Sequence, residues 1–473
     1  MNDGMHVRIR GATHARSYDA RPNRGASRSV LRGPNPTGLI DKFAVIPILA
    51  CFFAVIVGPL LSYLNPPSTE AVLIGSDGSL APRFFWPALS FIAIILALQN
   101  RSRLNLPPHL ICLFAYLVLA GTSVLWALSP EHSFIRFLQQ VMVVTSIVLP
   151  AMLAGRTVDM MRALFLCFAL ALILNLFVVL TGSSQIARYG SLLVRIGYPG
   201  YFLTKNQLGE CAAAAFLLSL HETFQPGYRR ALGIAAVVIA VFLVFKSDSK
   251  TAFGLALACP ILAWLTLLVR RVTHLSPAVI LLSLPLLYVL VSSVSHSSVM
   301  ERISYILYHD SSLTGRTTIW DFVKTEIAKS PLIGWGYQSF WLVPDSPSLT
   351  APGWVKSMPN AHNGYYDTML ETGYAGFAFL LLFIMATLHA VGRVADRDPA
   401  RARLLLSFVL FMILYNFFES LWMRGFEALW VVFVIVAAEI GRYRLPFPPR
   451  QAAVGLKSQR LGGHHPSPDA PGA

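Results

Sequence analysis

The chain has 473 residues, of which 55% are hydrophobic and only 13% are charged, and its mean hydropathy is +0.59. A soluble globular protein carries about 25% charged residues, so this composition excludes a soluble domain and predicts a membrane protein. The formal net charge is +15, but the basic residues lie mostly in the tails and in short segments between apolar runs, which favours a role in topology and argues against nucleic-acid binding.

The two ends of the chain are polar. Residues 1–42 are rich in Arg, Gly and Ser and poor in acidic residues, a composition that mitochondrial transit peptides share. The apolar run that follows is too long for a signal-peptide core, so we favour a disordered cytoplasmic tail. Residues 442–473 are rich in Pro, Gly and Ser and predict a second disordered cytoplasmic tail.

Residues 43–441 predict one all-α transmembrane domain of a polytopic membrane protein. Because an apolar helix of ~20 residues crosses a hydrocarbon core of ~30 Å, we expect about 12 transmembrane helices. The predicted spans are 43–64, 84–99, 109–128, 134–154, 160–181, 202–220, 231–247, 251–269, 277–294, 373–392, 403–420 and 425–441. All five cysteines fall inside these spans; they predict apolar packing residues and neither a disulfide nor a metal site.

The distribution of basic residues sets the orientation of these spans. If both termini are cytoplasmic, the short cytoplasmic segments carry clustered arginines, as at 101–103, 229–230, 270–271 and 393–403. Cytoplasmic loops of membrane proteins carry an excess of Lys and Arg. This agreement predicts cytoplasmic termini and places one long loop, residues 295–372, on the outer face of the membrane.

The long loop contains a predicted amphipathic helix. The apolar residues from Ile319 to Ile327 recur at helical spacing, and Pro331 ends the pattern. Thr318 with Asp321 resembles a capping box at the start of this helix. Loops of mixed composition and this length are usually functional when they are ordered.

A turn at residues 358–363 leads into a second predicted helix, which Gly373 interrupts before the next span. His362 lies in this turn. Histidine is the commonest general base in enzymes, so His362 is a candidate catalytic residue, with Asn363 either orienting it or capping the helix. The alternative is an exposed histidine with no chemical role.

Several cations lie on the outer face at membrane level, where topology disfavours them. They are Arg188, Arg195, Lys205, Lys246, Lys250 and Arg316. Arg and Lys neutralise phosphate, and the helix N-terminus beside Arg316 adds free N–H groups. Together they predict a diphosphate site at the membrane surface; the alternative is contact with lipid headgroups.

The carboxylates inside predicted spans include Glu210, Glu419 and Glu439. Ionisable groups in lipid are costly and often functional, and a proton-coupled transporter could use Glu210 and Glu419. The alternative is that they pair with neighbouring cations, as Glu419 could with Arg424.

Three motifs in order resemble the O-antigen ligase and polysaccharide polymerase superfamily. The first is Lys-Asn-Gln-Leu-Gly at 205–209; the second is Gly-Arg-Thr-Thr-Ile-Trp at 315–320, followed by Ser-Pro-Leu-Ile-Gly-Trp-Gly-Tyr at 330–337 and Phe-Trp at 340–341; the third is Ala-His-Asn at 361–363 with Glu-Thr-Gly-Tyr-Ala-Gly at 371–376. With the spans and the long loop, the resemblance covers roughly residues 40–440.

The resemblance implies a role for several residues. Two arginines in the ligases hold the diphosphate of the donor; Arg316 matches one of them, and Lys250, in a Ser-Lys-Thr turn, stands where the other would be. His362 matches the histidine that activates the acceptor. Lys205, Asn206, Arg195 and Asn363 are expected to bind substrate, and no cofactor or metal is implied.

The implied function is a membrane glycosyltransferase of the bacterial inner membrane. It would polymerise undecaprenyl-diphosphate-linked repeat units of an exopolysaccharide on the periplasmic face, because the Ser-Lys-Thr turn looks more like the polymerase branch. The alternatives are an O-antigen ligase that transfers glycan to lipid A-core, a transporter of lipid-linked sugars, and a non-catalytic assembly component that would tolerate loss of His362 and Arg316. Expected partners are the lipid-linked oligosaccharide, the bilayer, and chain-length regulator and export proteins, with no nucleic acid.

Overall fold

The computed structural model describes residues 42–65, 81–155, 158–181, 197–295 and 315–444, and these segments are helices and connecting turns without a strand. The prediction of an all-α fold is therefore confirmed. Both predicted tails lie outside the described residues, apart from a few residues next to the first and last helices.

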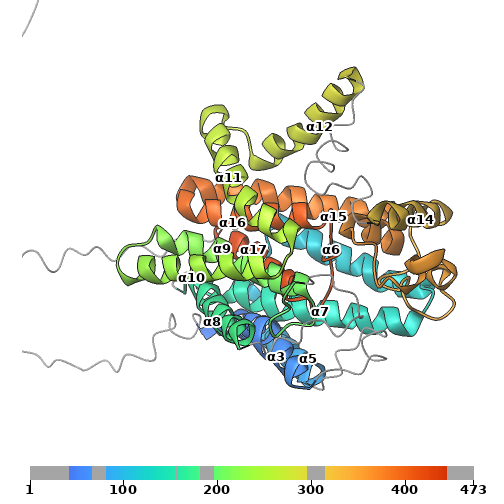
Figure 1. The fold of residues 1–473 in the computed structure, drawn as a ribbon, viewed down its shortest axis with the longest axis horizontal. Coiled ribbons are helices and arrows are strands. Elements are labelled where there is room, and N and C mark those ends of the chain that lie inside the picture. Colours follow the sequence, from blue (N-terminus) through green and yellow to red (C-terminus); the bar gives the residue numbers. More distant parts are fainter. Residues whose placement is uncertain (1–41, 66–80, 156–157, 182–196, 296–314, 445–473) are drawn as a thin grey trace, which may run out of the picture.

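Most of the described chain forms helices that run alongside one another (Figure 1). Their bounds are α2 Val45–Phe52, the π-helix η1 Phe53–Val57, α3 Gly58–Leu64, α5 Ala81–Gln99, α6 Pro108–Thr122, α7 Pro130–Leu153, α8 Met160–Leu180, α9 Lys205–Thr223, α10 Tyr228–Lys246, α11 Lys250–Thr273, α12 Pro277–Ser295, α14 Arg316–Lys329, α15 Gly364–Arg397, α16 Pro399–Tyr415 and α17 Ala428–Arg442.

Eight helical segments among the described residues are long and apolar enough to cross a membrane. They are Val45–Leu64, Ala81–Gln99, Pro108–Trp126, Pro130–Leu153, Met160–Leu180, Tyr228–Lys246, Lys250–Thr273 and Gly364–Arg397. The remaining predicted spans coincide with α9, α12, α16 and α17, so the chain is a multi-pass membrane protein and a bundle of about 12 spans is consistent with the structure.

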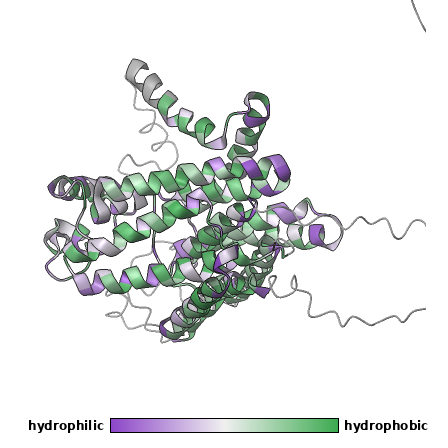
Figure 2. Cartoon of the chain, turned by 180° about the vertical axis from the view of Figure 1, so that it is seen from behind, coloured by the Kyte–Doolittle hydropathy of each residue, from purple (hydrophilic) through white to green (hydrophobic). Residues whose placement is uncertain are grey.

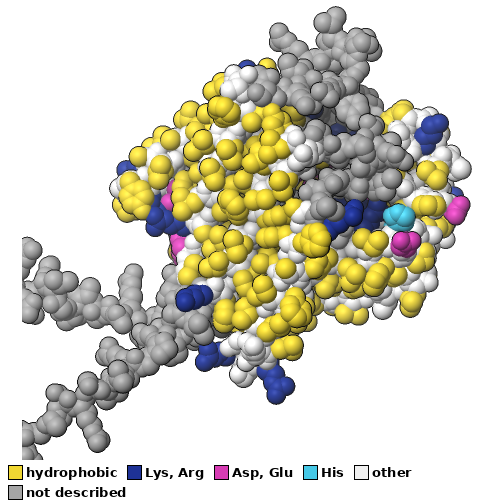
Figure 3. All heavy atoms as spheres, turned by 90° about the horizontal axis from the view of Figure 1, so that it is seen from below, with side chains coloured by type: hydrophobic (Ala, Val, Ile, Leu, Met, Phe, Trp, Pro, Cys, Tyr) yellow, Lys and Arg dark blue, Asp and Glu magenta, His cyan; other side chains and the backbone are white. Residues whose placement is uncertain are grey.

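The surface of the bundle matches a lipid environment. Hydrophobic residues follow the bodies of the helices, whereas hydrophilic residues gather near their ends and in the connecting loops (Figure 2). Large apolar side chains such as Phe91, Phe177 and Phe245 are more than half exposed, and they cover much of one face of the molecule (Figure 3). In water this surface would drive aggregation, whereas in a bilayer it is solvated.

Two helices in the centre of the bundle are buried on nearly all sides. Every residue of α17 from Leu429 to Arg442 is buried, and the run Ala212–Ala215 in α9 is fully buried. Small residues let the backbones of membrane helices approach closely, which explains why α9 has a lower hydropathy than the lipid-facing helices and still lies inside the domain.

The part of the long loop that the structure describes, residues 315–363, folds into a small core. Ile319, Val323 and Ile327 of α14 pack with Phe340 and Val355. The predicted helix is confirmed, but the predicted Thr318–Asp321 capping box is wrong, because α14 begins at Arg316 and its N-cap, Gly315, makes no side-chain cap.

The loop is fixed onto α15 where that helix breaks at Gly373. This glycine has φ +65°, and a Cβ on it would lie 2.2 Å from the Leu332 carbonyl carbon. Tyr374 N donates to Pro331 O at 2.7 Å, and Trp335 N donates to Leu370 O at 2.9 Å. The predicted interruption at Gly373 is confirmed, and the loop backbone occupies the space that it opens.

Candidate functional site

His362 is held by the turn that starts α15. Its backbone N–H donates to Oδ1 of Asn360 at 2.9 Å, and its φ is +48°. Asn363 is the N-cap of α15, where its Oδ1 accepts from Tyr365 N at 3.0 Å and Tyr366 N at 3.1 Å. This cap fixes the direction in which the chain enters the helix, and with it the place of the His362 ring.

Glu419 gathers three of the predicted site residues. Its Oε2 lies 3.0 Å from Nδ1 of His362. Its Oε1 accepts from Asn206 Nδ2 at 3.0 Å and pairs with Arg316 Nη2 at 3.2 Å. His362, Asn206 and Arg316 come from three separate segments, so one carboxylate joins the three sequence motifs in space.

The position of Glu419 corrects the predicted span 403–420. Helix α16 ends at Tyr415, and Glu419 lies in the loop beyond it. Asn416 Oδ1 accepts from the N–H groups of Leu421 and Trp422, both at 2.9 Å, which closes this loop. Glu419 is therefore not a carboxylate in mid-membrane but a loop residue whose side chain is 13% exposed.

The Glu419 loop and the His362 turn are bonded directly to each other. Asn363 N donates to Ser420 Oγ at 3.0 Å, and its Nδ2 donates to Phe417 O at 3.3 Å. Gly364 N donates to Asn416 O at 2.9 Å and to Glu419 O at 3.0 Å. These bonds fix the position of the Glu419 carboxylate relative to the His362 imidazole.

The contact with Glu419 selects one tautomer of His362. A carboxylate accepts a hydrogen bond, so Nδ1 is the protonated nitrogen, and Nε2 carries the lone pair. Within the described part of the chain, Nε2 makes no hydrogen bond, and the side chain is 29% exposed. The arrangement is that of a histidine base oriented by a carboxylate.

Two further predicted site cations, Lys205 and Lys250, lie at the starts of α9 and α11. Lys205 Nζ lies 3.4 Å from Oδ2 of Asp248, in the turn between α10 and α11. Glycines let other segments approach this turn: a Cβ on Gly197 would lie 2.0 Å from Ser247 O, and one on Gly209 would lie 2.6 Å from the Ser249 Cβ. Lys250 begins α11, is exposed, and forms no ion pair with the residues described.

The structure therefore brings some predicted site residues together and not others. His362, Arg316 and Asn206 meet at Glu419, with Lys205 next in sequence to Asn206. Arg188 and Arg195 lie outside the described residues. The Asn363 side chain is engaged in capping and in the bond to Phe417 O, which is a positioning role; its contact with substrate stays a prediction.

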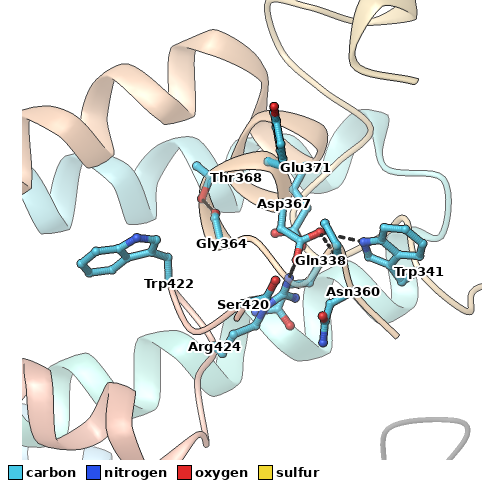
Figure 4. Close-up of polar contacts among 12 residues, drawn as sticks. Gln338, Trp341, Asn360, Gly364, Asp367, Thr368, Glu371, Ser420, Trp422 and Arg424 are labelled. Atoms are coloured by element: carbon cyan, nitrogen blue, oxygen red, sulfur yellow. Dashed lines mark hydrogen bonds and ion pairs between the residues drawn. The ribbon is translucent and has the colours of Figure 1, made fainter. Parts of the chain in front are cut away.

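Arg424 does not pair with Glu419, as the sequence suggested, but with two other carboxylates. Its Nη2 lies 3.1 Å from Asp367 Oδ2 and 2.9 Å from Glu371 Oε1 (Figure 4). Asp367 Oδ1 also accepts from Trp341 Nε1 at 2.8 Å. Burial lowers the pKa of the Arg424 guanidinium, but Glu371 and Asp367 outweigh burial and raise this pKa above its ordinary value.

The sequence analysis named Glu371 only as part of a motif and Arg424 only as a possible partner of Glu419, so it missed this second cluster. Asp367 and Glu371 are spaced four residues apart on one helix, which places both on the same face, and that spacing was the available signal. Nothing local pairs them with Arg424.

Residues 235–381 match the family model described as O-antigen ligase. This segment of the chain is similar to the O-antigen ligase family. Lys250, Arg316, His362 and Asn363 fall within the match, and Asn206 and Glu419 lie outside it. The predicted resemblance to this superfamily is thereby confirmed.

Two relatives extend the comparison beyond this segment. The exopolysaccharide production protein ExoQ of Rhizobium meliloti is 26% identical over 353 residues, which are 71% of this chain and 75% of the relative. A protein of Rickettsia bellii named "Putative polysaccharide ligase" is 28% identical over 138 residues, which are 28% of this chain and 33% of the relative. The family is involved in polysaccharide biosynthesis.

Proposed function

We propose that this protein is a membrane glycosyltransferase that polymerises undecaprenyl-diphosphate-linked repeat units of an exopolysaccharide on the periplasmic face of the bacterial inner membrane. The observation that carries the proposal is the convergence of His362, Arg316 and Asn206 on Glu419. The proposed base His362, the proposed phosphate-binding cation Arg316 and the orienting carboxylate Glu419 then lie in one place.

His362 is the base in the proposed reaction. Nε2 takes the proton from an acceptor hydroxyl as that oxygen attacks the anomeric carbon of the donor sugar. The bond between this carbon and the diphosphate oxygen breaks, and its electron pair leaves with the lipid diphosphate. The imidazolium then releases the proton to water, which restores the base. Glu419 stabilises the imidazolium through Nδ1, as the carboxylate of a catalytic triad does.

Arg316 is the main ligand of the leaving group. A guanidinium forms two parallel hydrogen bonds to phosphate oxygens, and negative charge on the diphosphate grows as the bond breaks. Arg316 also begins α14, where the positive end of the helix dipole favours an anion. Lys205 and Lys250 supply further positive charge from the neighbouring helix starts.

The second candidate is a ligase that transfers glycan to lipid A-core. The description of the matching family and the name of the Rickettsia relative favour it. The similarity to the exopolysaccharide protein extends over most of both chains, which favours polymerisation. The same residues would carry out either reaction, because the acceptor alone differs.

A complementation experiment tests the proposal. His362→Ala and Arg316→Ala are expressed in a strain that lacks the protein, and polymer, lipid-linked repeat units and membrane levels of each variant are measured. We expect loss of polymer and accumulation of single repeat units. Lys324→Ala, on the exposed side of α14, and His274→Ala, an exposed histidine between α11 and α12, are matched controls. Polymer at control levels in both site variants would refute the assignment.

A further inference from the structure

An amphipathic cavity lies beside the His362–Glu419 pair, and the proposed reaction does not yet use it. Its volume is about 860 Å³. None of His362, Arg316, Glu419 and Lys250 is among its lining residues. It shares a wall with the site, because Asn360, which accepts from His362 N, and Ser420, which accepts from Asn363 N, both line it.

One end of the cavity is apolar and opens toward lipid. Phe53 and Val55 of the π-helix η1 line it, together with Trp86 of α5 and Leu429 of α17. A π-helical turn inside an α-helix often marks a functional site, and here it lies directly on the cavity. Ile135 and Leu138 of α7 line the cavity and are also 48% and 40% exposed, so the mouth faces the membrane.

The other end is polar, and its groups suit hydroxyls. Gln338 Nε2 donates to Met423 O at 2.8 Å, while its Oε1 makes no hydrogen bond with residues that the structure describes. Asn360 uses its Oδ1 on His362, and its Nδ2 is free of described partners. Gln338 Oε1 can therefore accept a hydrogen bond and Asn360 Nδ2 can donate one. Both residues lie near the side chain of Trp341 (Figure 4), and together these groups can bind the hydroxyls of a sugar ring.

The charge of the cavity differs from that of the proposed diphosphate site. Its lining carries Arg83, Arg136 and Arg424, together with Glu210, Glu371 and Glu427, so cations and carboxylates are matched in number. In contrast, Lys205, Lys250 and Arg316 outnumber their acidic neighbours at the site. A balanced lining leaves hydrogen bonding as the basis on which the cavity selects a saccharide.

We infer that this cavity is the acceptor site: it takes a lipid-linked saccharide, with the terminal sugar at the polar end and the apolar carrier toward the mouth on α7. The inference rests on the proposed glycosyl transfer and names the place of its second substrate. The acceptor hydroxyl then lies against Asn360 and Ser420, which form the wall between the cavity and His362, and it enters from the membrane without passing the cationic site.

Site-specific photo-crosslinking tests the acceptor site. A benzophenone amino acid replaces Gln139, which lines the cavity on α7, and, as a matched control, Phe134, which is on the same helix, 49% exposed and not in the lining. Cells that make the repeat unit are irradiated, the tagged protein is purified, and mass spectrometry identifies what is attached. We expect saccharide-bearing adducts at position 139 and phospholipid alone at position 134.

A steric variant gives a second readout. Gln139→Trp fills the cavity and is expected to lower polymer output at least tenfold with repeat units accumulating, while Phe134→Trp leaves output unchanged. Phospholipid adducts alone at position 139, or no adduct there, would overturn the acceptor site, as would full activity of Gln139→Trp. Crosslinking at position 139 measures saccharide binding and does not depend on whether His362→Ala abolishes polymer. The two experiments therefore distinguish an incorrect acceptor site from an incorrect proposed reaction.

Discussion

At the scale of single residues, Glu419 decides how the site works. Its two oxygens serve different partners, with Oε2 at His362 and Oε1 at Arg316 and Asn206. The sequence identified His362, Arg316 and Asn206 because each stands in a recognisable motif. It noted Glu419 only as a costly carboxylate within an apolar run, because a pairing across more than 50 positions leaves no local pattern.

Glu419→Gln tests the orienting role. Glutamine keeps the size of the side chain but loses the charge that stabilises a protonated His362. We expect polymer output to fall by roughly 10²-fold, which is at the low end of the contribution of a general base. Single-turnover transfer with purified protein and lipid-linked repeat units measures this, and membrane levels are compared with those of Lys324→Ala. Unchanged turnover would show that the imidazole needs no carboxylate.

Lys250→Arg tests the one position where the sequence departs from the ligase pattern. If Lys250 binds phosphate, arginine retains the charge and adds a second parallel hydrogen bond, so activity is expected to persist in Lys250→Arg. Lys250→Ala is expected to lower activity about tenfold, which is the effect of losing one charge-assisted hydrogen bond. Donor KM is the measurement. Equal KM values for all three proteins would remove Lys250 from the diphosphate site.

At the scale of elements, the break in α15 is what joins the long loop to the membrane domain. The sequence predicted the two loop helices and the interruption, because Gly373 and Pro331 are local signals. It missed the true start of α14 and the early end of α16. Helical spacing marks the body of a helix better than its ends, and Glu419 belongs to such an end.

Gly373→Ala is expected to destabilise the protein. The residue has φ +65°, and a Cβ would meet Leu332 at 2.2 Å. Strain of this kind costs about 1–3 kcal/mol. Thermal unfolding in detergent measures the change against Gly254→Ala, since Gly254 lies inside α11 with nothing within 4 Å of an added Cβ. An unchanged midpoint for the Gly373 variant would mean that the loop can move away from the helix.

At the scale of the whole molecule, the sequence predicted the class and approximate course of the chain, because apolar runs and arginine-rich loops are properties of long segments. It did not predict the cavity between η1, α5, α7 and α17, whose walls come from distant helices. Nor did it place Arg424 with Asp367 and Glu371, which depends on how the helices pack.

Arg424→Met is expected to unfold much of the protein. The change leaves two buried carboxylates, Asp367 and Glu371, without their cation, and breaking a buried ion pair from one side costs about 3–5 kcal/mol. The amount of folded protein in the membrane is measured by size-exclusion profile. The exposed Lys324–Asp321 pair is the comparison, since its loss costs at most about 1 kcal/mol. Equal yields would mean that the carboxylates are protonated or hydrated.

Reporter fusions test the predicted orientation. Alkaline phosphatase inserted after Leu349 is expected to be active, because the outer loop faces the periplasm, while green fluorescent protein at the C-terminus is expected to fluoresce in the cytoplasm. The excess of arginines in the opposite loops is the physical reason. The reverse pair of signals would invert the whole topology and place the His362 site in the cytoplasm.

The sharing of Glu419 between His362 and Arg316 also has a genetic consequence. A substitution at Glu419 disturbs both partners at once, so a second substitution at either partner removes an interaction that is already lost. The effects of these three positions on turnover should therefore be strongly non-additive, with the double variants little worse than the worst single variant. Substitutions at Glu419 should therefore be constrained by more than one partner, because a compensating change at one partner would not restore the others.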